Sequence, residues 1–449
     1  MGGVAALVKK YPRFGPRIRL LIIMNYSFSS FFKSGMVRSL RHRDYTMYAL
    51  AGFVSNLGLW VQRVAVGWLT WTYTESWTWL GLIVFSEGMM ATIVMPIAGT
   101  YADRIDRIFL AKLSQVGLML ISALLAFLTF LDITNIWILL VLMMMSGVVE
   151  GLWAPVRLSM APNLVPKEDL SSAVGVSASL FNLAQFLGPA VAGIIIASFE
   201  SFEYQFGFAF GFNSITFLSY FIVLFFIKLR TTNSRSGKKL GFVSDFKAGV
   251  RYILDTPGLL LFVFLMLSTS FCLRPFREIF PGIADGVFSR GADGLALLTS
   301  ATGLGAIIGC LFVANMKSTK GVVRLMYTFL IIDVILQIFL VFCWNFTLAL
   351  TCVALMGFAV TTAGISGQVL LQSCVHDEMR GRVISLWGII MRGGVPTGAF
   401  FLGSLVSLLG YEAGLLIISV IFICVLLIAI PRSGPVIERM EAPPPPELI

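Results

Sequence analysis

A few charged and polar side chains placed inside long apolar segments are the candidates for chemistry in this chain. Ionisable groups are costly inside a bilayer, so those that occur there usually face an aqueous cavity or one another. Arginine can grip a carboxylate, catecholate or phosphate, and a buried carboxylate can exchange a proton. The residues predicted to bind substrate or to couple it to an ion are Arg63, Glu87, Gln185, Arg274, Arg277 and Arg392.

Arg63 and Glu87 lie at similar depth in consecutive apolar runs, each roughly 12–17 Å from the same membrane face at 1.5 Å per residue. This common depth predicts an ion pair. In one interpretation, Glu87 exchanges a proton while Arg63 attracts substrate or tunes the carboxylate. In the other, the two residues form a permanent structural pair, which is costly to break.

Arg274, Arg277 and Glu278 lie near Pro275 and Pro281 in the outer third of a later apolar run. Two arginines one turn apart can grip an anionic group of a substrate. Alternatively, these charges form an outer gate of salt bridges that closes the cavity. Both interpretations stay open on the sequence alone.

The residue types that other chemistries need are missing from the sequence. It has two histidines, His42 and His376, both in polar stretches, and its six cysteines include no Cys-x-x-Cys pair. It also contains no Gly-x-x-x-x-Gly-Lys phosphate loop, no metal-ligand cluster and no Ser/His/Asp set. The sequence therefore predicts no enzyme activity, no metal, no cofactor and no transport driven directly by ATP.

Composition places the chain in a membrane. Of its 449 residues, 57% are hydrophobic and 12% are charged, whereas a soluble protein carries about 25% charged residues. Twelve apolar runs of spanning length fall into two sets of six. The predicted fold is an all-α integral membrane protein with 12 transmembrane helices in two six-helix bundles.

The domain boundaries follow from the longer polar stretches. We expect residues 1–44 to be a basic cytoplasmic N-terminal extension, 45–228 and 258–430 the two bundles, 229–257 a cytoplasmic linker, and 431–449 a Pro-rich cytoplasmic tail. Apolar residues in the linker repeat at helical spacing, which predicts an amphipathic helix along the membrane surface. Four prolines at 443–446 predict an extended or disordered tail. Residues 1–35 are interpreted as a loosely held extension or as the product of a mis-assigned start.

Basic residues orient the chain. Most of the 33 Lys and Arg residues lie in the two ends, the linker and the loops on the same side, and Arg290 is the one in an opposite-side loop. Because positively charged loops stay in the cytoplasm, both termini and the linker are predicted to be cytoplasmic. The net charge of +10 is therefore explained by topology, and no nucleic-acid partner is expected.

A short polar hinge between the second and third apolar runs reads Gly-x-x-x-Asp-Arg-x-x-Arg over residues 99–107. This pattern resembles the signature loop of the major facilitator superfamily. The family usually has Gly where this chain has Asp106, and a basic residue where it has Ile108. The resemblance implies that Gly99, Asp103, Arg104 and Arg107 act as a conformational latch, with topology-determining charge as the alternative.

Further stretches resemble the branch of this superfamily that holds the enterobactin exporter and macrolide efflux pumps. They are residues 57–65, 153–157, 164–166, 188–193 and 380–387. The resemblance implies a two-bundle secondary transporter that rocks between two states. It also implies that Glu150 completes a charge relay with the hinge, although Glu150 can instead pair with Arg157 two turns away.

Two halves related by duplication place substrate near the membrane midplane. Gln185 and Arg392 each precede a proline by four residues, in corresponding runs of the two halves. Arg392 is expected to face the cavity or to pair with an acid on a neighbouring helix. Asp333, in the ninth run, is expected to have a hydrogen-bonded structural role.

Five tryptophans crowd the outer ends of the first two runs. An interfacial aromatic belt explains most of them, and an aromatic-lined cavity explains the rest. They are Trp60, Trp68, Trp71, Trp77 and Trp79.

The predicted function is proton-coupled export of a small amphipathic molecule across a bacterial inner membrane by a monomer, with an anionic, siderophore-like compound as one candidate. The excess of intramembrane arginine over acid favours an anionic substrate, and export itself is implied by the resemblance. The alternatives are a broad-specificity drug or macrolide efflux pump, uptake or lipid flipping, and, in a different class, a transport-inactive membrane sensor.

Overall fold

The computed structural model describes residues 35–102, 106–160, 163–229, 242–256, 258–316 and 320–441. Within these ranges, 12 helices are long and apolar enough to cross a membrane. The first bundle contains α3 (Arg43–Thr74), α4 (Trp77–Ala102), α5 (Arg107–Phe130), α6 (Ile136–Met160), α7 (Leu170–Ala197) and α8 (Phe202–Val223). Short 3₁₀ turns η1 (Gly35–Arg41) and η3 (Lys167–Asp169) precede α3 and α7.

The second bundle begins with an interrupted span. It contains α10 (Leu259–Cys272), a 3₁₀ turn η4 (Arg274–Ile279), α11 (Phe280–Gly282) and a π-helical turn η5 (Ile283–Val287). The interruption coincides with two prolines, Pro275 and Pro281, which remove backbone donors from the helical ladder. Five helices complete the bundle: α12 (Gly291–Ala314), α13 (Val322–Val341), α14 (Phe346–Cys374), α15 (Asp377–Leu409) and α16 (Tyr411–Ala429).

Local signals explain several helix ends. The side chain of Asp106 accepts a hydrogen bond from the Ile108 amide at 2.7 Å and caps α5, and Asn345 caps α14 in the same way. Gly410 follows α15 with a φ of 89°, a conformation that a residue with a Cβ rarely adopts. The Asp that departs from the family pattern in the hinge therefore has a capping role.

Two expectations about the segments near the bundles need correction. The first bundle was expected to continue to residue 228, but its sixth span, Phe202–Val223, ends at Val223. The tail was expected to be extended or disordered, yet Ser433–Glu441 forms helix α17, so that prediction is wrong for these residues. The carboxylate of Glu441 accepts hydrogen bonds from the amides of Gly321 and Val323 at 2.8 and 2.9 Å, which holds the helix against the start of α13. The four prolines lie outside the described residues.

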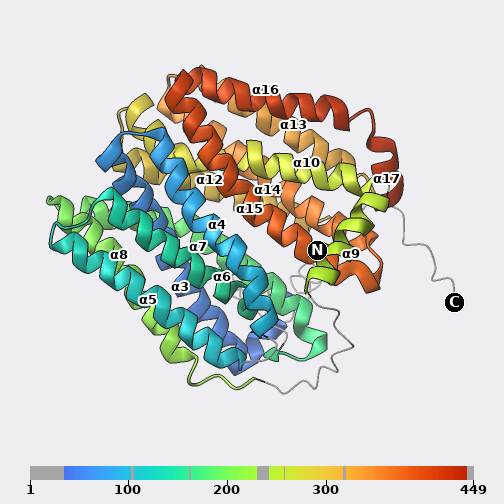
Figure 1. Ribbon diagram of the computed structural model, residues 1–449, viewed down its shortest axis with the longest axis horizontal. Helices are drawn as coiled ribbons and strands as arrows, with labels where there is room; N and C mark the ends of the chain where they lie inside the picture. Colours follow the sequence, from blue (N-terminus) through green and yellow to red (C-terminus); the bar gives the residue numbers. More distant parts are fainter. Residues whose placement is uncertain are drawn as a thin grey trace, which may run out of the picture.

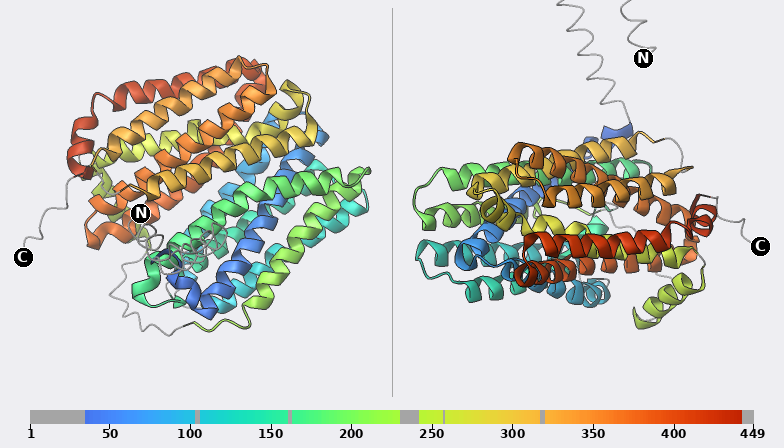
Figure 2. Two further views of the ribbon diagram at one scale, coloured as in Figure 1. Left: turned by 180° about the vertical axis from the view of Figure 1, so that it is seen from behind. Right: turned by 90° about the horizontal axis from the view of Figure 1, so that it is seen from above.

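The linker contains helix α9 (Phe242–Asp255). We call the end of the molecule where α9 and α17 lie the linker end. Figure 1 shows the first bundle in blue to green and the second in yellow to red, closer together at the other end than at the linker end. The two views of Figure 2 show the same two groups of helices from behind and from above.

The bundles touch each other at the end opposite the linker end. We call this opposite end the closed end. Glycines let α4 and α15 approach: a Cβ at Gly81 would meet the carbonyl of Ala399, and one at Gly403 would meet that of Trp77. Trp77 also stacks on Tyr411 with ring centroids 5.9 Å apart. A side chain at either glycine would push the two helices apart, so the contact depends on glycine at both positions.

Candidate functional site

A cavity of about 780 Å³ lies between the two bundles. It extends from Thr70 and Leu295 near the closed end to Tyr48 and Val174 near the linker end. Both bundles contribute charged side chains to its wall. They are Arg63, Glu87, Glu150, Arg157, Arg274, Arg277, Glu278 and Arg392.

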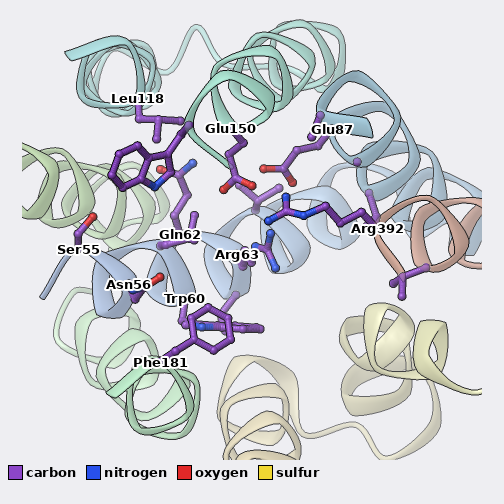
Figure 3. A pocket seen from close by; sticks show the side chains of 18 of the residues that line it. Ser55, Asn56, Trp60, Gln62, Arg63, Glu87, Leu118, Glu150, Phe181 and Arg392 are labelled. Atoms are coloured by element: carbon purple, nitrogen blue, oxygen red, sulfur yellow. The ribbon is translucent and has the colours of Figure 1, made fainter. Parts of the chain in front are cut away.

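Arg63, Glu87, Glu150 and Arg392 come from four different helices and converge on one part of the cavity, as Figure 3 shows. Arg63 interacts electrostatically with Glu87 and Glu150, and Arg392 interacts with Glu150. Among the described residues, Arg63 and Glu87 nevertheless form no direct ion pair in this conformation. The two residues belong instead to one charged cluster that also contains Glu150 and Arg392.

Close helix packing fixes the position of Glu87. A Cβ at Gly147 of α6 would meet the Glu87 carbonyl oxygen, and one at Gly88 would meet the ring of Pro396 on α15. Helix α4 is therefore held between the two bundles at this level. The Glu87 side chain lines the cavity.

Trp60 lies between two guanidinium groups, one from each bundle. The Cζ of Arg63 is 5.2 Å from the indole centroid, and that of Arg277 is 5.6 Å from it. Such cation–π contacts contribute about 0.5–2 kcal/mol each. The ring also makes an edge contact with Phe181 at 6.3 Å. Its Nε1 is buried and has no hydrogen-bond partner within the described part of the chain.

The second bundle supplies its arginines from the interrupted span. Arg277 Nε donates to Glu278 Oε1 at 3.0 Å, so these neighbouring residues partly neutralise each other. Arg274 has no such adjacent acid, and its Nε is buried without a partner among the described residues. A side chain at Gly364 of α14 would come within 2.5 Å of its Nη2, so the guanidinium lies against α14.

The structure brings together most of the predicted binding residues but not all of them. Gln185 of α7 is absent from the residues that line the cavity. Glu150, expected to complete a charge relay with the hinge or to pair with Arg157, lies beside Glu87, Arg63 and Arg392, and the relay stays a prediction.

The hinge itself is only partly described. Asp103 and Arg104 lie outside the described residues, so the latch stays a prediction. Gly99 lies in the last turns of α4 with no atom within 4 Å of its absent Cβ, and Arg107 begins α5.

The aromatic-belt interpretation is wrong for Trp60 and Trp71, which are each only 6% exposed. Trp60 lines the cavity, and Trp71 donates through Nε1 to Asp285 of the other bundle at 2.9 Å. The sequence analysis did not identify Asp285. An acidic residue in the apolar run after Pro281 was the available signal.

The sequence that builds this cavity matches a known protein family. The family described as transmembrane secretion effector, within the major facilitator superfamily, matches residues 34–445. The chain belongs to this family. The protein is therefore a transmembrane transporter with 12 membrane-spanning helices. It is related to siderophore exporters.

Two curated relatives illustrate that relationship. The staphyloferrin A transporter of Staphylococcus aureus is 23% identical over 388 residues, which cover 84% of this chain and 93% of the relative. The enterobactin exporter EntS of Escherichia coli O1:K1 is 26% identical over 406 residues, which cover 86% and 92%.

Solved structures of other transporters share the fold of this protein. A bacterial homologue of the human lysosomal transporter Spinster, in an inward-facing and occupied conformation, aligns with a TM-score of 0.67 at 14% identity and covers 89% of this chain and 97% of that one. The nucleoside transporter NupG aligns with a TM-score of 0.67 at 11% identity, covering 87% and 99%. At identities this low, the structural similarity shows a shared fold and nothing more about function.

Proposed function

We propose that this protein exports a small amphipathic anion by proton-coupled transport, with alternating access of the cavity to the two sides of the membrane. The carrying observation is the convergence of Arg63 and Arg392 with Glu87 and Glu150 in a cavity that the closed end shuts on one side. The distribution of Lys and Arg favours a cytoplasmic linker end, from which the cavity would receive its substrate.

The arrangement of charge favours an anionic substrate with a flat apolar part. Five arginines line the cavity against three glutamates, and Glu278 is already engaged with Arg277. An anion would therefore find uncompensated positive charge. The Trp60 ring lines the cavity and offers a flat surface beside that charge. The names of the two relatives, a staphyloferrin A transporter and an enterobactin exporter, agree with this class of substrate.

Glu87 is the residue that would exchange the proton. It lies opposite Arg63 and close enough to Glu150 to interact with it. Two carboxylates that share a site with arginines hold a proton more readily when the arginines turn to an anion. Binding of the anion and uptake of a proton would then be linked through the same charges.

The test uses the full-length protein in proteoliposomes, with enterobactin and erythromycin as probes and an internal dye to follow pH. We expect enterobactin to move and to drive proton flux, with Glu87→Gln losing proton flux at least tenfold while still binding enterobactin. Arg63→Ala should weaken enterobactin binding. The control, Glu412→Gln, changes an exposed carboxylate outside the cavity and should behave like wild type.

Transport of erythromycin alone, with Glu87→Gln indistinguishable from wild type, would contradict both the anionic substrate and the role of Glu87. It would favour the alternative of a broad drug or macrolide efflux pump, in which Arg63 and Glu87 serve structure only.

A further inference from the structure

A second group of buried polar side chains lies in the second bundle, away from the cavity wall. Asp333 of α13 is 2% exposed, and Gln337, one helical turn further, is fully buried. Within the described part of the chain, Asp333 Oδ1 and both amide atoms of Gln337 have no hydrogen-bond partner. Since buried polar groups are almost always paired, this group needs an explanation other than structural stability.

Arg274 connects this group to the cavity. It lines the cavity and also interacts electrostatically with Asp333. The guanidinium occupies the space that a side chain at Gly364 would take. Helix α14 packs against α13, so Gly364 leaves room for the arginine between the cavity and Asp333.

Arg274 is the charged group that acts on Asp333. The other described titratable side chains on the spans packed against α13 are not among the groups that act on Asp333, which lies in the middle of α13. They are Cys352 and Cys374 on α14 and Tyr411, Glu412 and Cys424 on α16. A buried carboxylate is costly to keep ionised unless an opposite charge stays beside it. Asp333 has only one such charge to balance it, and the Arg274 side chain can turn toward the cavity instead.

We propose that Asp333 is a second proton-binding site of this transporter, and that it acts on substrate through Arg274. When Asp333 is ionised, Arg274 turns toward it and is held against α14. When a proton binds to the carboxylate oxygen that has no partner, Asp333 becomes neutral, and the Arg274 guanidinium is free to bind an anion in the cavity. This inference rests on the proposed anion-binding role of the cavity, but its proton site can be tested without any substrate.

The experiment is pH-difference infrared spectroscopy of the full-length protein in lipid nanodiscs, which detects the carbonyl band of a protonated carboxyl group. We expect wild type to show a band from Asp333 that is lost in Asp333→Asn and kept in Glu87→Gln. Asp132→Asn is the matched control, because Asp132 is exposed and has a φ of 55° that Asn tolerates. An Asp333→Asn spectrum identical to that of wild type would overturn the proposal.

Two further variants keep the test informative if Asp333→Asn does not fold. Arg274→Gln removes the compensating charge and should move the midpoint of the Asp333 band to higher pH by about 1–3 units. Gly364→Ala displaces the guanidinium and should move the same midpoint. If neither variant moves the midpoint, Asp333 and Arg274 are not coupled and the proposal fails.

A binding measurement separates this inference from the proposed function. Enterobactin affinity measured against pH in Asp333→Asn should lose one proton-linked step, whereas Glu87→Gln should retain the step that belongs to Asp333. If the Asp333 band is present but enterobactin does not bind at any pH, the proton site stands and the anionic substrate is wrong. If enterobactin binds and affinity follows pH identically in wild type and Asp333→Asn, the link through Arg274 is wrong.

Discussion

The two bundles treat their buried polar groups differently, although they share one architecture. In the first bundle, Gln62 of α3 accepts hydrogen bonds from Ser122 of α5 and Asn213 of α8, both at 2.7 Å. These helices are the first, third and sixth of their bundle. In the second bundle, the third and sixth helices carry Gln337 and Ser419, which have buried polar atoms without partners among the described residues.

This difference suggests a division of labour between the halves. A fully paired network rigidifies a bundle, whereas unpaired buried groups cost free energy and persist where function requires them. The Gln62 network thus makes the part of the wall beside Arg63 rigid, although Trp60 and Gln115 of the same bundle each have a buried polar atom without a described partner. The second bundle, with its interrupted span and its free polar groups, contains the parts that we expect to change state.

The largest predicted effect separates the two networks by stability. Gln62→Leu leaves Asn213 without its acceptor and should lower the free energy of unfolding by about 1–3 kcal/mol. Gln337→Leu replaces an amide that has no described partner, so it should change that free energy by no more than about 0.5 kcal/mol or raise it. Denaturant titration in mixed micelles measures both variants.

Equal losses in the two variants would contradict the comparison, because Gln337 would then have to be hydrogen-bonded in the folded protein. Thr347→Val is a suitable reference for a helical polar-to-apolar change, since it alters an exposed position at the start of α14.

The second prediction concerns the contact that joins the bundles. Trp71→Phe keeps an aromatic ring but removes the hydrogen bond to Asp285, and bonds to charged groups contribute about 1.5–3 kcal/mol. The population of molecules in which the bundles have separated at the closed end should therefore rise about 10–100-fold. Spin labels at positions 75 and 412, in a protein with the exposed Cys424 changed to Ser, would report it as a longer distance between the bundles.

Trp79→Phe is the matched control for this gate. Trp79 makes an edge contact with Trp137 inside the first bundle, at 5.1 Å, so its replacement should leave the distance distribution unchanged. An equal shift in both variants would mean that general loss of indole packing, and not the bond to Asp285, opens this end.

Much of this organisation could be predicted from the sequence. Hydropathy determined the number of spans, and polar residues inside them identified Arg63, Glu87, Arg274, Arg277 and Arg392, all of which line the cavity. Hydropathy gives the depth of a residue in the membrane because depth follows position along the helix.

What could not be predicted was the direction in which each helix turns its side chains. Gln185 lies at a suitable depth but outside the cavity lining. Trp71 looked interfacial yet reaches across to Asp285. These outcomes depend on helix rotation and on contacts between residues more than 200 positions apart, and neither leaves a periodic pattern in a nearly uniform apolar run.

The smallest predicted effect lies at the linker end, where each bundle uses one acid to hold a neighbouring segment. In the first bundle, Asp169 accepts from Arg38 Nε at 2.9 Å and lies 2.8 Å from His42 Nε2. The hydrogen bond with His42, together with Arg38, lowers the pKa of Asp169 below its ordinary value. The carboxylate therefore stabilises the fold at pH values above about 4, the ordinary pKa of an aspartate, and this contribution is lost as pH falls through the lowered pKa.

Asp169→Asn should accordingly melt at a lower temperature than wild type at neutral pH, and the difference should shrink as the pH is taken below about 4. Glu168→Gln is the control, because Arg38 contacts the backbone oxygen of Glu168 at 3.1 Å and not its carboxylate. A melting difference for Asp169→Asn that stays constant across this range would show that the side chain acts through shape or neutral hydrogen bonding. The charge at this end of the first bundle would then contribute nothing to its stability, in contrast to the carboxylate of Glu441, which binds two backbone amides in the second.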